Sequence, residues 1–195
     1  MAQNITTDQP VNAYFLKVFS GFDANGQQII SDNPSFVGDP NPHVIFGFSN
    51  TLRFNKLTFT LNASGASGFL IYNNTLNTVT NISNISQGKN IAAAFIDSKE
   101  NIKASVAASS RYLEKGDYIK LRNATLSYAF GNMGKYAKNL NVFVSGTNLF
   151  VITKFTGFDP EVNIDKSSNN YPSRSIEFIP YPTPRLITFG FNLSL

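Results

Sequence analysis

Residues that could carry out catalysis or hold a metal are few in this 195-residue chain. Asp159, Glu161 and Asp165 form an acidic group, but no base or nucleophile accompanies them, so we expect Asx-type hydrogen bonds that fix a loop. The segment 23–26, Asp-Ala-Asn-Gly, begins like a calcium loop but lacks the later acidic ligands, so an Asn-Gly turn is expected. His43 is the single histidine and cysteine is absent. The sequence therefore predicts no enzyme activity, no cofactor and no metal site.

Small neutral side chains that alternate with apolar ones form a second group of candidate residues. Their hydroxyl and amide groups form hydrogen bonds without charge, which suits an uncharged polar solute and poorly suits ion selectivity. This wall, predicted to face the lumen of a barrel, consists of Thr58, Thr60, Asn62, Ser64, Asn123, Thr125, Ser127, Asn192 and Ser194. Aromatic residues between the strands are candidates for stacking on sugar rings; they are Tyr72, Phe95, Tyr112 and Phe155.

The polar residues belong to stretches in which apolar and polar positions alternate, as expected of β-strands with two different faces. Six strands are predicted, the first weaker than the others, at 13–22, 44–54, 57–64, 117–130, 140–152 and 187–195. In the fourth strand we expect the apolar face to continue through Tyr118, Lys120 and Arg122, so that an outer face becomes basic near one end.

The connections between these strands differ in length. Those at 55–56 and 131–139 are short, whereas 23–42, 73–116 and 153–184 are long. Short turns at one end and long loops at the other are typical of an outer-membrane β-barrel, and the predicted strands are long enough to span a bilayer. The alternative is a soluble β-sandwich, which predicts charged outer faces, whereas only 14% of the residues are charged.

Several stretches resemble the SusC/RagA family of TonB-linked outer-membrane transporters of Bacteroidota. The longest is 111–128, RYLEKGDYIKLRNATLSY. The other stretches follow the family's order: 38–42 (GDPNP) with 47–50 (GFSN), 147–162 (TNLFVITKFTGFDPEV) and 181–185 (YPTPR). The similarity covers about residues 10–195.

The resemblance implies an all-β fold in which residues 1–195 form the C-terminal part of a transmembrane antiparallel β-barrel. About the last six strands of a barrel of roughly 22 would be present. The long segments 23–42, 73–116 and 153–184 would be extracellular loops, and the plug and the TonB box would lie outside these residues.

By the same resemblance, the parent protein imports glycans or oligopeptides across the bacterial outer membrane. The implied partners are a SusD-like surface lipoprotein, the TonB–ExbB–ExbD complex, the remaining barrel and plug, and outer-membrane lipid. The scattered net charge of +4 does not indicate nucleic-acid binding. The alternative function is a structural or assembly subunit of a larger outer-membrane complex without transport.

The last strand carries a motif made of Thr188, Gly190, Leu193 and Leu195. It resembles the C-terminal signal that the outer-membrane insertion machinery reads by pairing with the strand. Leu195 stands where an aromatic residue is usual. The alternative for these four residues is an ordinary amphipathic strand.

Overall fold

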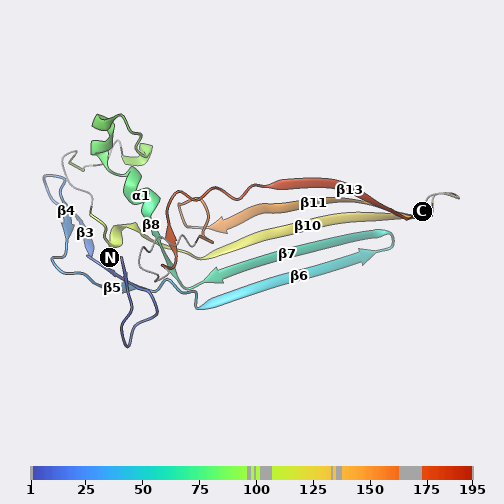
Figure 1. The fold of residues 1–195 in the computed structure, drawn as a ribbon, viewed down its shortest axis with the longest axis horizontal. Coiled ribbons are helices and arrows are strands. Elements are labelled where there is room, and N and C mark those ends of the chain that lie inside the picture. The colour runs from blue at the N-terminus through green and yellow to red at the C-terminus, as the bar shows by residue number, and fades with distance from the viewer. Residues whose placement is uncertain are drawn as a thin grey trace. The chain divides into compact units, whose positions relative to one another are not determined.

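The computed structural model describes residues 2–95, 98, 100–101, 107–132, 134, 138–162 and 173–194 (Figure 1). The chain divides into two compact units. We call residues 44–67, 118–153 and 182–195 the sheet unit, and residues 1–43, 68–117 and 154–181 the connector unit. Among the described residues, no helix is both long enough and apolar enough to cross a membrane.

The sheet unit is one five-stranded antiparallel sheet in the order β13-β11-β10-β7-β6, and Figure 1 shows these long strands side by side. The strands are β6 (Val44–Phe54), β7 (Leu57–Ser67), β10 (Tyr118–Gly131), β11 (Lys138–Thr153) and β13 (Leu186–Ser194). Asn55, with φ +55°, lies in the two-residue turn between β6 and β7, as expected for a tight hairpin. The prediction of long antiparallel strands is confirmed.

Alternation gives this sheet one apolar face, which is exposed. One row of opposed residues runs across the five strands through Leu52, Phe59, Leu126, Val144 and Phe189. Phe189 is 79% exposed, and Leu52 and Leu126 are exposed as well. A water-soluble sheet would cover so large an apolar surface with another layer.

Strand β10 contains a β-bulge that the sequence pattern did not predict. Leu121 lies opposite Ala63 of β7, but Asn123 lies opposite Asn62, so β10 has one additional residue, Arg122, at this point. Because the side chains of a strand alternate between its two faces, one inserted residue moves every side chain beyond it to the opposite face.

The bulge corrects the expected outer face of this strand. Ile119 and Leu121 continue the apolar face, whereas Tyr118 and Lys120 lie opposite polar-face residues of β7. Arg122 also reaches the polar face, where its Nε donates to Ser64. The prediction that the outer, apolar face becomes basic near one end is therefore wrong.

The connector unit contains short strands in three small sheets. The first sheet has the order β1-β2-β5, the second is the β3-β4 pair, and the third has the order β12-β8-β9. The strands are β1 (Gln3–Asn4), β2 (Ala13–Leu16), β3 (Phe19–Phe22), β4 (Gln28–Ile30), β5 (Ser35–Gly38), β8 (Leu70–Asn73), β9 (Leu113–Lys115) and β12 (Ile176–Glu177). Helix α1 spans Asn74–Val79, and 3-10 turns occur at Ile82–Gln87, Ala93–Phe95 and Ser110–Tyr112.

The predicted first strand, 13–22, is not part of the long sheet. It is divided into β2 and β3, which belong to different small sheets. At the break, Lys17 forms an isolated parallel bridge with Ser109, and Val18 donates its backbone N–H to the Ser31 hydroxyl. The long sheet therefore has five strands among the described residues rather than six, because nonlocal partners divide the first one.

A tyrosine cluster forms the core of the connector unit. It consists of Tyr14, Leu16, Tyr72 and Tyr112, all buried, and the rings of Tyr72 and Tyr112 meet edge to face at 6.2 Å. Burial raises the pKa of the Tyr14 and Tyr72 hydroxyls. These groups therefore stay protonated and act as hydrogen-bonding groups in the core.

Candidate functional site

The polar face of the sheet unit brings most of the candidate residues together. Opposed residues form rows that cross the strands. The two central rows are Thr51–Thr60–Thr125–Ser145–Thr188 and Ser49–Asn62–Asn123–Thr147. Their members are hydroxyl and amide side chains, so the centre of this face is a surface of neutral donors and acceptors.

Hydrogen bonds connect these side chains from strand to strand. Ser49 Oγ donates to Asn62 Oδ1 at 2.7 Å. Asn123 Nδ2 donates to Ser145 Oγ at 2.9 Å, and the hydroxyls of Thr125 and Ser145 lie 2.7 Å apart. Cross-strand bonds hold the side chains in defined orientations, which prepares the surface to bind a polar solute at low entropic cost.

The register places the predicted wall residues on this one face. Thr58, Thr60, Asn62 and Ser64 of β7 share it with Asn123, Thr125 and Ser127 of β10. Asn192 joins them through its pairing with Asn141. The side chain of Ser194 lies outside the described residues. That this face borders a lumen stays a prediction.

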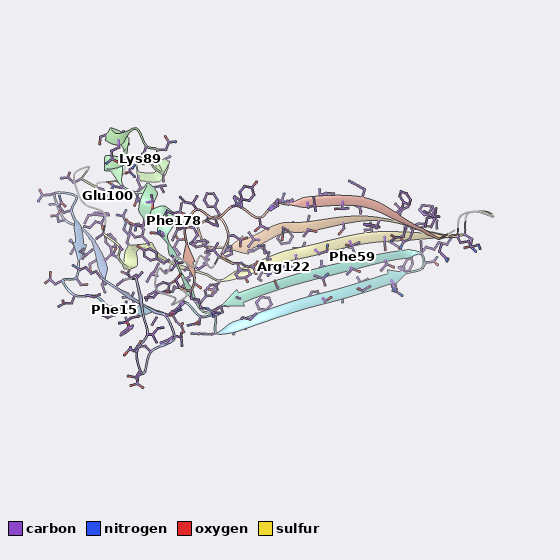
Figure 2. All side chains as sticks on the ribbon, viewed as in Figure 1. Phe15, Phe59, Lys89, Glu100, Arg122 and Phe178 are labelled. Atoms are coloured by element: carbon purple, nitrogen blue, oxygen red, sulfur yellow. The ribbon has the colours of Figure 1, made fainter. Side chains whose placement is uncertain are left out.

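Basic residues share the polar face, which the sequence pattern missed. Lys120 lies opposite Ser64 and is 5% exposed. The Nε of Arg122 donates to the same serine hydroxyl at 2.7 Å. Figure 2 labels Arg122 on the long sheet. Arg53, on β6, faces Thr58. The sequence does contain a signal for the two basic residues of β10. Leu121 and Leu126 are an odd number of positions apart, so one strand can keep both on the apolar face only if a residue is inserted between them.

The closing strand has a local packing reason for its glycine. Gly190 lies opposite Phe143 of β11, and any Cβ at Gly190 would collide with the Phe143 ring. A bulky ring that covers a glycine on the next strand stabilises both strands. Thr188 faces Ser145, and Leu193 is exposed. Leu195 lies outside the described residues, and the role of the four residues as an assembly signal stays a prediction.

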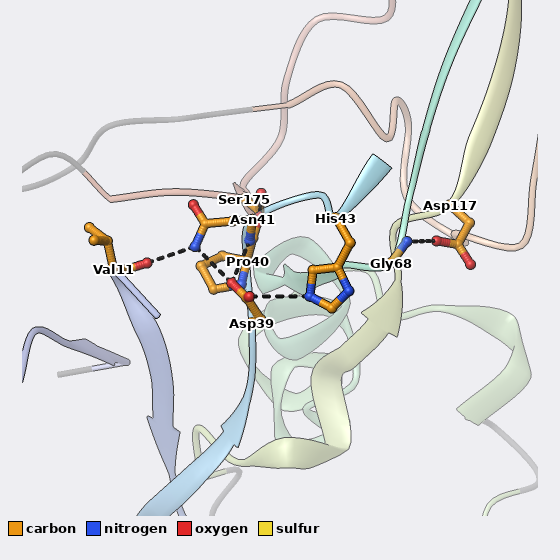
Figure 3. A network of polar contacts seen from close by, with 8 residues as sticks. All are labelled: Val11, Asp39, Pro40, Asn41, His43, Gly68, Asp117 and Ser175. Carbon is orange, nitrogen blue, oxygen red and sulfur yellow. Dashed lines mark hydrogen bonds and ion pairs between the residues drawn. The ribbon is translucent and has the colours of Figure 1, made fainter. Parts of the chain in front are cut away.

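In the connector unit, the GDPNP stretch forms a polar network (Figure 3). Asp39 Oδ1 accepts from the backbone N–H of Asn41 at 2.8 Å and from its Nδ2 at 2.7 Å. Asn41 Nδ2 also donates to the carbonyl of Val11 at 2.9 Å. His43 Nε2 lies 3.4 Å from Asp39 Oδ2. The motif is an Asx-type turn that joins two segments distant in sequence.

The acidic residues of the RYLEKGDY stretch hold neighbouring segments. Glu114 accepts from Asn73 Nδ2 at 2.9 Å, from the backbone N–H of Thr156 at 2.7 Å and from its hydroxyl at 2.7 Å. Asp117 accepts from the backbone N–H of Gly68 at 2.7 Å. These carboxylates replace backbone partners where strands end, so their role is structural.

Arg111, from the same stretch, lies in an aromatic enclosure. Its guanidinium pairs with both carboxylate oxygens of Glu100, and the two side chains are almost completely buried. Four rings surround it at 5.0–5.4 Å, those of Phe19, Phe22, Phe95 and Tyr112. Cation–π contacts and the paired carboxylate together compensate for the desolvation of the charge.

The acidic loop residues have structural roles where the structure describes them. Asp23 Oδ1 accepts from the backbone N–H groups of Asn25 at 2.9 Å and Gln27 at 2.7 Å, which confirms the predicted turn. Asp159 Oδ1 accepts from the N–H of Glu161 at 3.0 Å, the expected Asx-type bond. Asp165 lies outside the described residues. Within the described part, no three His, Asp or Glu residues cluster as metal ligands would.

Three of the four aromatic residues proposed for sugar stacking are not available for it. Tyr72, Tyr112 and Phe155 are buried. The ring of Phe95 packs on the Arg111 guanidinium. The expectation of stacking is therefore wrong for the three buried rings, because the connector unit uses its aromatic residues as a core rather than as a surface.

The chain is similar in sequence to several known receptors. No family model matches the chain. It is 31% identical to TonB-dependent receptor P26 of Formosa agariphila over 189 residues, which is 88% of this chain and 19% of the receptor. It is 28% identical to receptor P3 of the same organism over 195 residues, covering 91% of this chain and 19% of that protein. TonB-dependent receptor SusC of Bacteroides thetaiotaomicron is 24% identical over 183 residues, covering 89% and 17%.

Solved structures of a peptide importer called RagAB share this fold. Its open-open state matches with a TM-score of 0.75 at 19% identity, over 100% of this chain and 24% of that chain. Its closed-closed state matches with a TM-score of 0.72 at 19% identity, over 99% and 25%. The chain therefore spans about a fifth of the length of the curated relatives. In sequence and in fold, this chain is a segment of an outer-membrane β-barrel receptor of the TonB-dependent, SusC/RagA-like type.

Proposed function

We propose that the protein containing this chain is a TonB-dependent importer in which the sheet unit forms part of the barrel wall. The observation that carries the proposal is one sheet with two unlike faces, an exposed apolar one and a hydrogen-bonded polar one. The apolar face would contact lipid, and the polar face would contact the lumen.

Strand length supports a transmembrane position. The five strands are 9 to 16 residues long, and a tilted strand needs about 9–11 residues to cross the hydrocarbon layer. The exposed row through Phe59 and Phe189 would be costly in water and favourable in lipid. No enzymatic step is part of the proposal.

The two outer strands indicate the first partner. β6 and β13 each have a neighbour on only one side within this sheet. Unpaired backbone groups are not tolerated in hydrocarbon, so both edges would pair with further strands of the same barrel. The remainder of the barrel and a plug inside it are therefore proposed partners.

The connector unit supports the position of the other partners. The segments 23–42, 73–116 and 153–184, nearly all of which belong to this unit, would be the extracellular loops, and the Tyr14 cluster and the Arg111–Glu100 pair would hold their described residues together. Such a surface is suited to a SusD-like lipoprotein above the barrel. Import of glycans or oligopeptides would use energy delivered by TonB–ExbB–ExbD to the plug.

Uptake by the full-length protein in cells with and without TonB tests the function. We expect a mixture of oligopeptides and oligosaccharides to include solutes whose uptake is lost in both the receptor deletion and the tonB deletion. Uptake that continues without TonB would contradict the energised mechanism. A receptor deletion that changes outer-membrane assembly but no uptake would support the structural-subunit alternative instead.

A further inference from the structure

The two units differ in the sign of their charged residues. All 12 Asp and Glu residues of the chain belong to the connector unit, and the sequence of the sheet unit contains none. The sheet unit nevertheless contains seven basic residues, namely Arg53, Lys56, Lys120, Arg122, Lys135, Lys138 and Arg185. Its fixed charge is therefore positive only.

Lys135 lies outside the described residues, and the other six fall into two groups by position. Lys56 is in the β6–β7 turn, Lys138 is the first residue of β11, and Arg185 precedes β13. Charges at strand ends are common in membrane barrels and need no further explanation. The second group, Arg53, Lys120 and Arg122, lies within the strands and on the polar face.

The bulge of β10 creates the second group. Without the additional residue, Lys120 would point to the apolar face, and Ile119 and Leu121 would point to the polar one. With the additional residue, Lys120 and Arg122 both lie beside Ser64, and the neutral row that contains Asn62 is next to them. Arg122 therefore adds a positive charge to the neutral hydrogen-bonding surface, and the buried Lys120 adds a second charge beside the same serine.

We infer that this surface selects anionic oligomers, that is, solutes that combine uncharged polar groups with carboxylate, sulfate or phosphate groups. The inference rests on the proposed import function and names its substrate class. Fixed Lys and Arg charges on a barrel wall favour anions, and the guanidinium of Arg122 matches the shape of a carboxylate or sulfate. Lys120 and Arg122 already have polar partners in the protein, and their charge acts on a passing solute without requiring a vacant donor.

The neutral rows explain why the solute would be an oligomer rather than a simple ion. Thr60, Thr125 and Ser145 offer hydroxyls along a stretch of wall that a single small anion would not contact. A chain of sugar or peptide units could contact these hydroxyls and place an acidic group beside Lys120 and Arg122. The wall is thus better described as cationic and polar than as neutral.

The experiment uses the full-length receptor and two matched pairs of solutes. One pair is an oligogalacturonate and its methyl ester, and the other is a Glu-containing oligopeptide and its Gln counterpart. The two pairs distinguish a saccharide from a peptide source of the acidic group. We expect TonB-dependent uptake of the acidic member of one pair to exceed that of its neutral partner by ~10-fold at low salt, and the ratio to fall as NaCl is raised.

Substitutions separate the wall charges from the total charge. Arg122→Gln keeps a donor for Ser64 and removes the charge, and we expect it to lower the acidic-to-neutral uptake ratio by ~3–10-fold. Lys56→Gln removes the same charge from a turn and should leave the ratio unchanged. Because Lys120 is buried, Lys120→Gln serves as a second variant only where heat-modifiable gel migration shows a folded barrel.

The outcomes are distinguishable from failure of the proposed function. TonB-dependent uptake that does not discriminate between acidic and neutral partners would overturn the inference and leave the import function intact. An Arg122→Gln variant that loses neutral and acidic uptake equally would also overturn it, because the charge would then act only on the protein. Absence of TonB-dependent uptake for every solute would overturn the function itself.

Discussion

The sheet unit and the connector unit stabilise their chains in opposite ways. The connector unit buries a tyrosine cluster and encloses an ion pair in aromatic rings, as a water-soluble domain does. The sheet unit leaves its large apolar residues exposed and depends on backbone ladders between long strands. One chain therefore contains a part with a buried core of its own and a part whose apolar face is exposed and, by the proposal above, contacts lipid. Variants that destabilise one unit and leave the other unchanged can test this difference.

The largest effect is expected in the connector unit from Arg111→Ala. Removing the guanidinium leaves Glu100 buried without its ion-pair partner, which destabilises by about 3–5 kcal/mol. Hydrogen exchange of the full-length protein should show loss of protection around β3 and β4, while the long strands stay protected. Arg111→Lys, which keeps the charge but not the planar fork, should fall between wild type and Arg111→Ala. Equal loss of protection in both units would contradict the independence of the connector unit.

A smaller but still large effect is expected from a charge on the apolar face. Leu126→Lys in β10 would place an ammonium group in lipid, which costs about 2–4 kcal/mol near the middle of a bilayer. The matched variant Thr125→Lys places the same charge on the polar face one residue away. Outer-membrane abundance and urea unfolding in liposomes should show a strong defect for Leu126→Lys only. Similar defects in both would show that the two faces do not differ as assigned.

The Tyr14 hydroxyl offers a third comparison within the connector unit. The Tyr14 hydroxyl donates to the backbone carbonyl of Ser175 and accepts from the backbone N–H of Tyr72 at 3.1 Å. The same N–H also donates to the Ser175 carbonyl at 3.0 Å, so Tyr14→Phe leaves neither group unpaired and costs about 0.5–1.5 kcal/mol for each hydrogen bond that is lost. The control Tyr181→Phe, at a residue that is 89% exposed, should have no measurable effect. Hydrogen exchange at β8 is the measurement. A silent Tyr14→Phe would mean that water replaces the hydroxyl.

The same tyrosines predict a pH dependence. Burial raises the folded-state pKa of Tyr14 and Tyr72 above the ordinary value of 10.0, so the unfolded chain loses these protons first as pH rises. The stabilisation is thus complete below pH ~10 and decreases above it. Alkaline titration followed by hydrogen exchange should show the connector unit opening before the sheet unit, and Tyr14→Phe should reduce the slope.

Alternation predicted most of the sheet because a strand repeats every two residues and the two faces of this sheet carry unlike side chains. The polar face from Thr58 to Ser64 and the tight turn at Asn55 needed no information beyond the sequence. The bulge at Arg122 escaped because a single inserted residue is visible only as a change of phase, which resembles a change in composition.

The connector unit could not be predicted in the same way. Its strands are two to four residues long, and its contacts join distant segments, such as the parallel pairing of Tyr72 with Ile176. A pattern within a short window does not contain such information. For the same reason, the sequence pattern does not distinguish a buried ring such as Tyr112 from a surface one.

The smallest expected effect compares two glycines of the long sheet. Gly190 lies under the ring of Phe143, so Gly190→Ala forces the ring to move and costs about 1 kcal/mol, whereas Gly47 has open space and Gly47→Ala should be neutral. Urea unfolding in liposomes measures both. If ring contact is the cause, Phe143→Leu should make a second substitution, Gly190→Ala, less costly than it is alone.

If Gly190→Ala instead slows insertion without changing the unfolding free energy, and Phe143→Leu does not relieve it, the residue acts as an assembly signal. Gly190→Ala measured with and without Phe143→Leu thus separates a packing role of this glycine from a role in recognition by the insertion machinery.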